Sequence, residues 1–331
     1  EMGNNIVSVP LLYGGTYTLF AHMLPKLGIE VRFAKDDNPA NLEPLIDKKT
    51  AAVFCESLGN PAGNIPDMEA ICAMAHQHGV PVIVDNTVPT PVLMKPFQFG
   101  ADIVVHSLTK YMGGHGTSVG GIIVDSGQFP WPDHADRFPM LNNPEPAYHG
   151  VIYTQEFGLA AYVGRVRTVA LRNTGSAMSP MNAFFFLQGI ETLSLRMERH
   201  TENALKVAQY LEQHPAVAWV RYAGLPSSEY YQLAQKYMRG RPSALMTFGI
   251  KGGFDAGVKF YDALKLFKRL VNIGDAKSLA AHPASTTHRQ LTGPELAAAG
   301  VTQDMIRLCI GIENIDDILA DLEQALAASR I

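Results

Sequence analysis

The chain has 331 residues, 47% of them hydrophobic and 18% charged, so it is long enough for two domains with a large core. Its formal net charge of −4 gives no reason to expect nucleic acid or an anionic membrane surface as a partner. The three cysteines show no CxxC spacing, no segment reaches the ~18 apolar residues of a membrane span, and no signal-peptide pattern opens the chain, so a reducing, cytoplasmic setting is expected.

The first half of the chain alternates short apolar strands with helices. Strands are predicted at residues 5–9, 29–33, 51–55, 81–84, 102–105 and 121–124, and helices at residues 41–48 and 68–78. Asp67 is the expected N-cap of the second helix, in which Met68, Ile71 and Met74 recur on one face. This alternation indicates an α/β fold: a mainly parallel sheet with helices on both faces, whose ligands bind beyond the carboxyl ends of the strands.

The second half begins with a segment that is rich in Pro, Asp and Asn, residues 128–150, which predicts a long loop. The patterns after it predict helices as far as residue 187 and at 191–212, 256–267 and 316–327, with strands at 218–222, 245–250 and 305–310. We expect a domain boundary near Leu195, within a long helix. It divides the chain into a large domain, residues 1–195, and a smaller C-terminal domain, residues 196–331.

Lys110 is the first candidate for catalysis. It follows the apolar stretch 101–105 and lies in the run 107–111, Ser-Leu-Thr-Lys-Tyr. A loop lysine normally keeps its ammonium group in water. Because two hydroxyl side chains lie within three positions of it, we favour a nucleophilic lysine that forms a Schiff base and is activated by partial desolvation and nearby positive charge.

Ser107 and Thr109 supply these hydroxyl groups. They could satisfy backbone groups in a turn, or they could offer O–H and N–H donors to a phosphate dianion. Their spacing of two predicts that both face one side of an extended segment, with Lys110 turned to the other side.

Asp85 and Tyr13 complete the candidates that the residues themselves suggest. Asp85 follows a buried-looking strand, where it either forms an Asx turn or pairs with a cation such as a pyridinium nitrogen, since an unpaired buried carboxylate is costly. Tyr13 precedes Gly14 and Gly15, which permit close backbone approach, and it is either a core aromatic or a ring that stacks on a cofactor and carries protons.

Metal and nucleotide motifs are missing from the sequence. The Gly-rich stretch 113–121 matches neither GxGxxG nor a P-loop, and the 11 histidines form no HExxH motif or Cys/His cluster, so no metal is expected. A Schiff-base lysine, hydroxyls for a phosphate and a strand-end carboxylate for a pyridinium nitrogen are instead what pyridoxal 5'-phosphate (PLP) needs. The residues therefore predict a PLP-dependent enzyme.

These motifs resemble the PLP-dependent enzymes of cysteine and methionine metabolism, the trans-sulfuration family, over nearly the whole chain. The resemblance implies the PLP-dependent transferase fold type I, with a mainly parallel sheet of the seven-stranded type and a smaller C-terminal α+β domain. Residues 13–16 are similar to the family's ring-stacking tyrosine motif, and residues 85–87 to its pyridinium-binding segment, which adds Thr87 to the cofactor-binding set. Asn60 resembles the asparagine near the cofactor's 3-hydroxyl, and Arg307 the arginine that grips the substrate carboxylate.

Within the family, residues 115–118, the Pro-rich insert and residues 272–278 look most like the O-acetylhomoserine sulfhydrylase branch. Other branches usually carry serine where Asn272 stands. The resemblance implies that Asn272, Asn60 and Arg307 bind the substrate. The implied reaction is γ-replacement on O-acetyl-L-homoserine with sulfide or a thiol, which gives L-homocysteine or methionine and acetate. Lys110 and Tyr13 are the expected proton carriers.

Two other functions stay open. The same site would also serve a cystathionine γ-synthase or a γ-lyase. Family members begin upstream with an arm that carries a tyrosine and an arginine and reaches the neighbouring subunit's phosphate, and no such arm precedes Glu1. We therefore expect an N-terminally incomplete large domain, and a non-catalytic fragment that acts only as a binding or assembly partner is the second alternative. The family also implies a homo-oligomer, a dimer of dimers.

Overall fold

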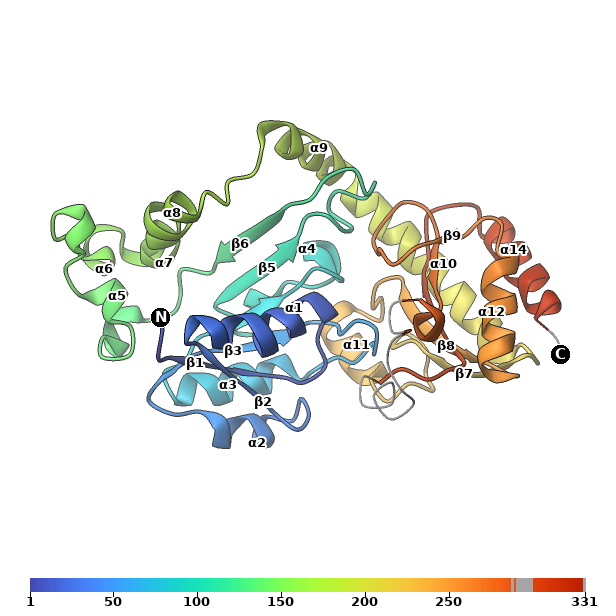
Figure 1. Cartoon of the computed structure of the whole chain (residues 1–331), viewed down its shortest axis with the longest axis horizontal. Coiled ribbons are helices and arrows are strands. Elements are labelled where there is room, and N and C mark those ends of the chain that lie inside the picture. The colour runs from blue at the N-terminus through green and yellow to red at the C-terminus, as the bar shows by residue number, and fades with distance from the viewer. Residues whose placement is uncertain (287–288, 290–299, 330–331) are drawn as a thin grey trace.

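Two β-sheets organise the chain in a computed structural model, which describes residues 1–286, 289 and 300–329 (Figure 1). The first sheet has six strands in the order β2-β1-β3-β4-β5-β6. Its strands are β1 (Asn5–Ser8), β2 (Glu30–Phe33), β3 (Thr50–Glu56), β4 (Val82–Asp85), β5 (Ile103–Ser107) and β6 (Gly121–Asp125). The first five are parallel, and β6 runs antiparallel to β5.

The mixed first sheet confirms the predicted α/β class and corrects the strand number, since the described residues contribute six strands rather than seven. Burial follows position in the sheet. The central strand β3 is almost wholly buried, whereas Ile122, Ile123 and Val124 of the edge strand β6 are exposed. Strands buried on both faces become continuous apolar runs, which is the pattern that the sequence shows at β3.

The second sheet has five strands in the order β7-β8-β11-β10-β9. Its strands are β7 (Val217–Arg221), β8 (Leu245–Ile250), β9 (Lys268–Arg269), β10 (Leu279–Ala281) and β11 (Met305–Cys309). All its pairs are antiparallel except that of β9 with β10. Helices α10 and α12 pack on it and α14 packs against both of them, which gives this part of the chain the expected α+β character.

The helices are of unequal length, and the short ones lie mostly in the first half. The α-helices are α1 (Gly14–Thr18), α2 (Pro39–Leu42), α3 (Met68–Gln77), α4 (Thr90–Leu93), α5 (Pro139–Asn142), α6 (Tyr153–Glu156), α7 (Ala161–Arg165), α8 (Arg172–Thr174), α9 (Pro180–Glu191), α10 (Leu193–Gln213), α11 (Tyr231–Met238), α12 (Gly253–Ala263) and α14 (Ile315–Ala328). The 3₁₀ and π turns are Leu19–Met23, Leu24–Leu27, Glu43–Leu45, Pro96–Phe99, Trp131–His134, Pro146–Tyr148, Gly158–Ala160, Val166–Leu171 and Pro283–Ser285. The Asp67 carboxylate accepts the Ala70 N–H at 3.4 Å, which confirms the predicted N-cap of α3.

Three predicted segments differ from the structure. The helix expected at 41–48 is α2 followed by one 3₁₀ turn that ends at Leu45, because Pro44 has no N–H to donate. The loop expected at 128–150 contains three short helical segments, each with a proline in its first turn, where a fixed φ favours helix initiation. The helix expected at 256–267 ends at Ala263, because the N–H groups of residues 265–267 donate to the Asp321 carboxylate of α14 instead.

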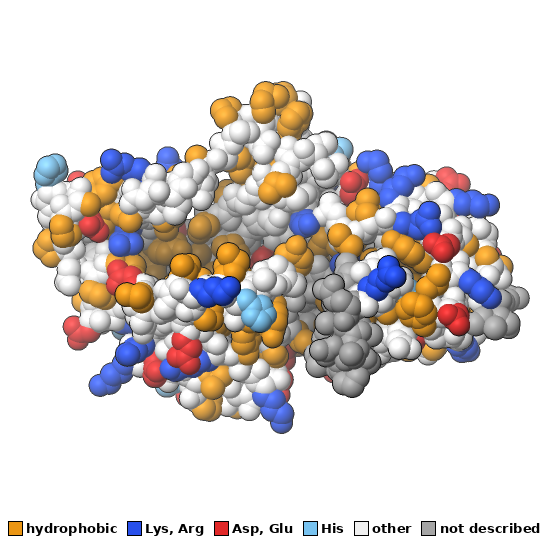
Figure 2. Space-filling view, in the orientation of Figure 1, with side chains coloured by type: hydrophobic (Ala, Val, Ile, Leu, Met, Phe, Trp, Pro, Cys, Tyr) orange, Lys and Arg blue, Asp and Glu red, His pale blue; other side chains and the backbone are white. Residues whose placement is uncertain are grey.

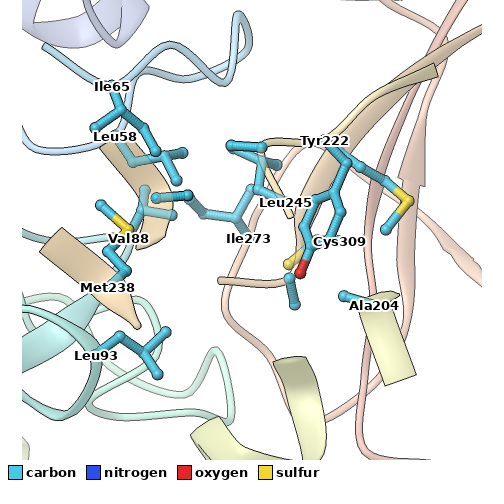
Figure 3. Packing of buried hydrophobic residues seen from close by; sticks show 14 of the residues in the cluster. Leu58, Ile65, Val88, Leu93, Ala204, Tyr222, Met238, Leu245, Ile273 and Cys309 are labelled. Atoms are coloured by element: carbon cyan, nitrogen blue, oxygen red, sulfur yellow. The ribbon is translucent and has the colours of Figure 1, made fainter. Parts of the chain in front are cut away.

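One apolar core continues from the first sheet to the second. Figure 3 shows Leu58, Val88 and Leu93 of the first part facing Met238 and Ile273 of the second. Leu195, the predicted domain boundary, lies in α10, which leads from one sheet to the other; we keep the division at this residue as a proposal. Among the described residues, no helix has the length and apolar character to cross a membrane.

Candidate active site

The candidate site forms where three neighbouring strands of the first sheet end. Glu56, Asp85 and Ser107 are the last residues of β3, β4 and β5. The register places Glu56 beside Asp85. Because these strands are parallel, all three side chains lie at the same, carboxyl edge of the sheet, which is where ligands of such sheets bind.

Asp85 is partly exposed and makes the bond of an Asx turn. Its Oδ1 accepts the N–H of Thr87 at 2.9 Å. Burial raises the pKa of Asp85, and the hydrogen bonds from Thr87 act in the opposite direction. Since no basic side chain of the described residues offsets its charge, a cationic ligand would stabilise this carboxylate.

Thr87 ties the ends of β4 and β5 together. Its Oγ1 accepts the backbone N–H of Ser107 at 2.8 Å, and its hydroxyl also bonds to Asp85. The Asp85 carboxylate and the start of the lysine-bearing loop are thereby held in one arrangement.

Lys110 lies in a series of turns, residues 108–113, that follows β5. Its N–H donates to the Ser107 carbonyl at 3.3 Å, and its own carbonyl accepts the Gly114 N–H at 2.8 Å. The expected extended segment with alternating Ser107, Thr109 and Lys110 is therefore wrong, because turn hydrogen bonds replace those of a strand. Thr109 takes the role of satisfying backbone groups: its Oγ1 donates to the Gly120 carbonyl at 3.3 Å and accepts the Gly120 N–H at 3.1 Å.

The tip of Lys110 meets residues from the second half of the chain. Its Nζ donates to Oδ1 of Asn272 at 2.5 Å. The Arg307 guanidinium donates to the Val271 carbonyl at 2.6 Å and to Oδ1 of Asn60 at 3.4 Å. Burial and the positive charge of Arg307 lower the pKa of Lys110, which favours its neutral, nucleophilic amine. The structure thus brings together Lys110, Asn272, Arg307 and Asn60.

Close packing against Gly274 holds the loop of Asn272 beside the lysine loop. A Cβ added to Gly274 would lie 2.4 Å from the Tyr111 nitrogen and 2.9 Å from the Lys110 carbonyl carbon, and Gly274 has a φ of +75°. Only glycine meets both conditions without displacement.

Tyr13 is the N-cap residue of α1, and its side chain is 49% exposed, so it is not a core aromatic. Its N–H donates to Oε1 of Glu56 at 2.6 Å. A Cβ added to Gly15 would lie 2.6 Å from the Tyr13 ring, so any other residue at position 15 would displace this ring.

The sequence interpretation missed two residues of this region. Glu56 ends its strand as Asp85 does, and that shared position was the available signal. Arg196 of α10 is buried and donates to the carbonyls of Tyr111 and Met112, directly after the lysine. No local pattern distinguishes Arg196 from the exposed Arg199 of the same helix.

A cavity of about 520 Å³ lies elsewhere, beside the pair formed by the exposed His76 and the buried Asp102. Asp102 directly precedes β5, so this cavity is at the opposite edge of the sheet from Lys110. Among the described residues, no cluster of three His, Cys, Asp or Glu side chains is arranged to hold a metal ion.

Comparison with known proteins adds three findings. A family model described as Cys/Met metabolism PLP-dependent enzyme matches residues 1–327. The homocysteine synthase of Schizosaccharomyces pombe is 53% identical over 327 residues, and the O-acetyl-L-homoserine sulfhydrylase of Leptospira meyeri is 51% identical over 335 residues; the matches cover 98% of this chain and 76% and 75% of those proteins. A crystal structure from Campylobacter jejuni, described as an O-acetylhomoserine (thiol)-lyase, superposes with a TM-score of 0.92 at 42% identity, over 98% of this chain and 77% of that one.

The Campylobacter jejuni structure contains a pyridoxyl-lysine phosphate group, and its likeness to this chain confirms fold type I. The family model extends over both sheets of the structure and over the loop that carries Lys110. With nearly the whole chain matched, this protein belongs to the family of PLP-dependent enzymes of cysteine and methionine metabolism.

Proposed function

We propose that this chain replaces the acetate group of O-acetyl-L-homoserine with sulfide or a thiol, giving L-homocysteine or methionine and acetate. The observation that carries the proposal is the contact of Lys110 Nζ with Asn272, beside the Arg307 guanidinium. It places an amine of lowered pKa next to a group that can hold a substrate carboxylate. The names of the relatives from Schizosaccharomyces pombe and Leptospira meyeri support the choice of substrate.

The residues at the site fit PLP. The Asp85 carboxylate is partly exposed and without a basic partner among the described residues, so a protonated ring nitrogen would supply the missing cation. Lys110 would hold the cofactor covalently through Nζ, and Tyr13 would cover its ring. Ser107 would face its phosphate, together with N–H groups of the turns at 108–113, and Asn60 its 3-hydroxyl. Thr109 would join the phosphate ligands by exchanging its hydrogen bond to the Gly120 carbonyl for one to the phosphate.

When bound, PLP withdraws electrons from the α-carbon of the substrate. The Arg307 guanidinium would orient the substrate by its carboxylate. The neutral amine of Lys110 would take the α-proton, and Lys110 and Tyr13 would carry the later protons. In the net reaction the bond between the γ-carbon and oxygen breaks, acetate leaves with its electron pair, and a bond between the γ-carbon and sulfur forms.

Asn272 would act in substrate binding and on the lysine. Its Oδ1 accepts a hydrogen from Lys110 Nζ, and its backbone carbonyl accepts one from Arg307 at 3.4 Å. We propose that Asn272 thereby holds the two groups at a fixed separation, with the lysine amine facing the substrate that Arg307 binds.

Replacement of Lys110 by alanine tests the proposal. In the native protein, borohydride reduction should fix PLP to the chain, detected by mass spectrometry, and acetate release should depend on sulfide. In Lys110→Ala we expect no fixed cofactor and a loss of activity of about 10²–10⁴-fold or more. The exposed Lys95 offers a matched control, Lys95→Ala, which should retain both properties.

The same assay separates the other functions. Acetate release that requires a cysteine donor instead of sulfide would identify a cystathionine γ-synthase, and 2-oxobutanoate without a sulfur donor a γ-lyase. A native chain that fixes no PLP and releases no acetate would contradict the proposal and leave a role in binding or assembly only.

We further propose a cytoplasmic, reducing setting and a homo-oligomer. The three cysteines, all in the described part of the chain, are free and buried, which supports the first point. A group of exposed apolar side chains on α9 supports the second.

A further inference from the structure

Glu56 is a buried carboxyl group to which the proposed reaction assigns no role. It is the last residue of β3, it is only 5% exposed, and in the register of the sheet it lies beside Asp85. No basic side chain of the described residues acts on it, so an ion pair does not compensate its burial.

The Glu56 carboxyl group instead binds the backbone of two different segments. Its Oε1 accepts the N–H of Tyr13 at 2.6 Å, and the N–H of Asn60 is a second hydrogen-bond donor to it. Tyr13 leads into α1, whereas Asn60 follows β3. One buried group therefore joins the two segments that carry side chains proposed to contact the cofactor.

Burial and the neighbouring groups set the pKa of Glu56. Burial and the negative charge of Asp85 raise the pKa of Glu56 to about 8, although the bonds from Tyr13 and Asn60 lower it. The thiol of Cys55, on the same strand, stays neutral in this range because burial raises its pKa to about 12. Glu56 is therefore neutral at pH 7 and becomes ionised as the pH rises through about 8.

We propose that Glu56 is a positioning residue, whose carboxyl group holds the backbone of Tyr13 and Asn60 so that their side chains meet the cofactor ring and its 3-hydroxyl. This inference rests on the proposed function. In its neutral form, Glu56 leaves Asp85 as the one negative charge of the pair. In its ionised form, it adds a second negative charge and strengthens the attraction for a protonated ring nitrogen, so cofactor affinity should rise as Glu56 loses its proton.

Two variants of the full chain separate hydrogen bonding from charge. Glu56→Leu removes the acceptor oxygens, and Glu56→Gln keeps one acceptor oxygen but has no carboxyl proton to lose. The exposed Glu198 on α10 provides a matched control, Glu198→Gln. The primary measurement is the dissociation constant of PLP, from absorbance titrations between about pH 6 and about pH 10. Infrared spectra of the protonated carboxyl group, recorded over the same range, detect the titration directly.

We expect Glu56→Leu to weaken PLP binding by about tenfold or more and Glu56→Gln to recover most of that loss. The native chain and the Glu198→Gln control should show a rise in affinity and the loss of a protonated carboxyl band near pH 8. Glu56→Gln should show no such band and only the rise in affinity that comes from deprotonation of Lys110. If Glu56→Leu does not fold, the pH profile of Glu56→Gln still decides the outcome. Native-like affinity in Glu56→Leu, or the same pH profile in Glu56→Gln as in the native chain, would overturn the inference.

The Lys110→Ala experiment keeps this test distinct from the proposed function. If native protein fixes PLP through Lys110 but the Glu56 variants behave as the native chain does, only the positioning role fails. If native protein fixes no PLP, the proposed function itself fails, and the infrared titration still reports whether Glu56 holds its proton at neutral pH.

Discussion

The reactivity proposed for Lys110 comes from its surroundings in the fold and not from its neighbours in the sequence. Burial and the Arg307 charge lower its pKa, and Asn272 holds its Nζ. The Arg307 charge and the Asn272 hydrogen bond both come from the second half of the chain. Of the two hydroxyl groups that drew attention to this lysine, Thr109 is bonded to the Gly120 backbone. The sequence interpretation misjudged the geometry of this segment, because hydroxyl spacing does not reveal where a strand ends.

The charge of Arg307 should set the pH at which PLP attaches to Lys110. In Arg307→Gln that charge is lost, so the pKa of Lys110 should rise and attachment should require a higher pH, since only the neutral amine attacks an aldehyde. Arg307→Lys keeps the charge and should show little shift. It should nevertheless raise KM about tenfold, because an ammonium lacks the planar pair of donors that fits a carboxylate. The rate of PLP attachment as a function of pH gives the measurement, and equal shifts in the two variants would contradict this explanation.

The loop between β4 and the lysine shows how secondary-structure elements position the site. Thr87 Oγ1 accepts the N–H of Ser107 and bonds to Asp85, so the ends of β4 and β5 are held together. At the opposite edge, His76 of α3 donates through Nε2 to Asp102 at 2.8 Å, and Asp102 also accepts the Val82 N–H. These links join β4 and the residues flanking β5 at both edges of the sheet, and they add α3 at the second edge.

The His76–Asp102 pair should stabilise the fold only while His76 is charged. The hydrogen bond to Asp102 raises the pKa of His76, and burial opposes this. A raised pKa in the folded state means that the contribution is fully present below the unfolded value of about 6.5 and is lost as the pH rises through the folded value. We therefore expect His76→Gln, which keeps a hydrogen-bond donor, to lose stability at about pH 5.5 and almost none at about pH 9.

The expected loss is under about 1 kcal/mol, since the His76 side chain is partly exposed to solvent. Urea unfolding of both proteins at the two pH values provides the test. His78→Gln is the control, because the pair of His78 with Glu43 is exposed on both sides. A larger loss at high pH than at low pH would rule out the charge as the source.

At the scale of the whole molecule, buried polar contacts join the two sheets behind the site. The Tyr111 hydroxyl, directly after Lys110, lies 3.2 Å from Cys309 Sγ of β11 and accepts a hydrogen bond from Ser243 at 3.3 Å. Cys309 Sγ also accepts the Gly274 N–H at 3.2 Å. Lys110 and Arg307 therefore keep their relative position through contacts that neither residue makes itself.

The exposed apolar surface of α9 predicts that this chain assembles with a second copy of itself. Figure 2 shows hydrophobic side chains gathered over α9, and the helix exposes apolar residues around much of its circumference. They are Met181, Phe184, Phe185, Leu187 and Ile190. A helix that is apolar on most sides is normally covered, and we propose a second copy of this chain as the cover.

Light scattering during size-exclusion chromatography should find at least a dimer at micromolar concentration. The double variant Phe184→Ser, Leu187→Ser should weaken the assembly by at least tenfold, because each buried apolar side chain contributes roughly 1.5–3 kcal/mol. Glu198→Gln, an exposed polar change on the next helix, should leave the assembly intact. A native monomer, or a double variant that assembles as tightly as the native chain, would contradict an interface at α9.

The sequence by itself determined the α/β class, the N-cap at Asp67, most strand positions and the choice of Lys110 and Asp85 as chemical candidates. These are local properties, since the spacing of apolar residues, helix capping and polar residues at strand ends can each be recognised within about ten residues of sequence. It determined less well where helices end, because the ends depend on distant partners such as Asp321 of α14.

Only the tertiary structure decided that Lys110 meets Asn272, 162 positions away, that Arg307 meets Asn60, 247 positions away, and that Glu56 lies buried beside Asp85. Packing of the two sheets around one core brings these groups together and limits their contact with water. Burial and proximity then shift the pKa values on which the proposed chemistry depends, and neither quantity exists before the chain folds.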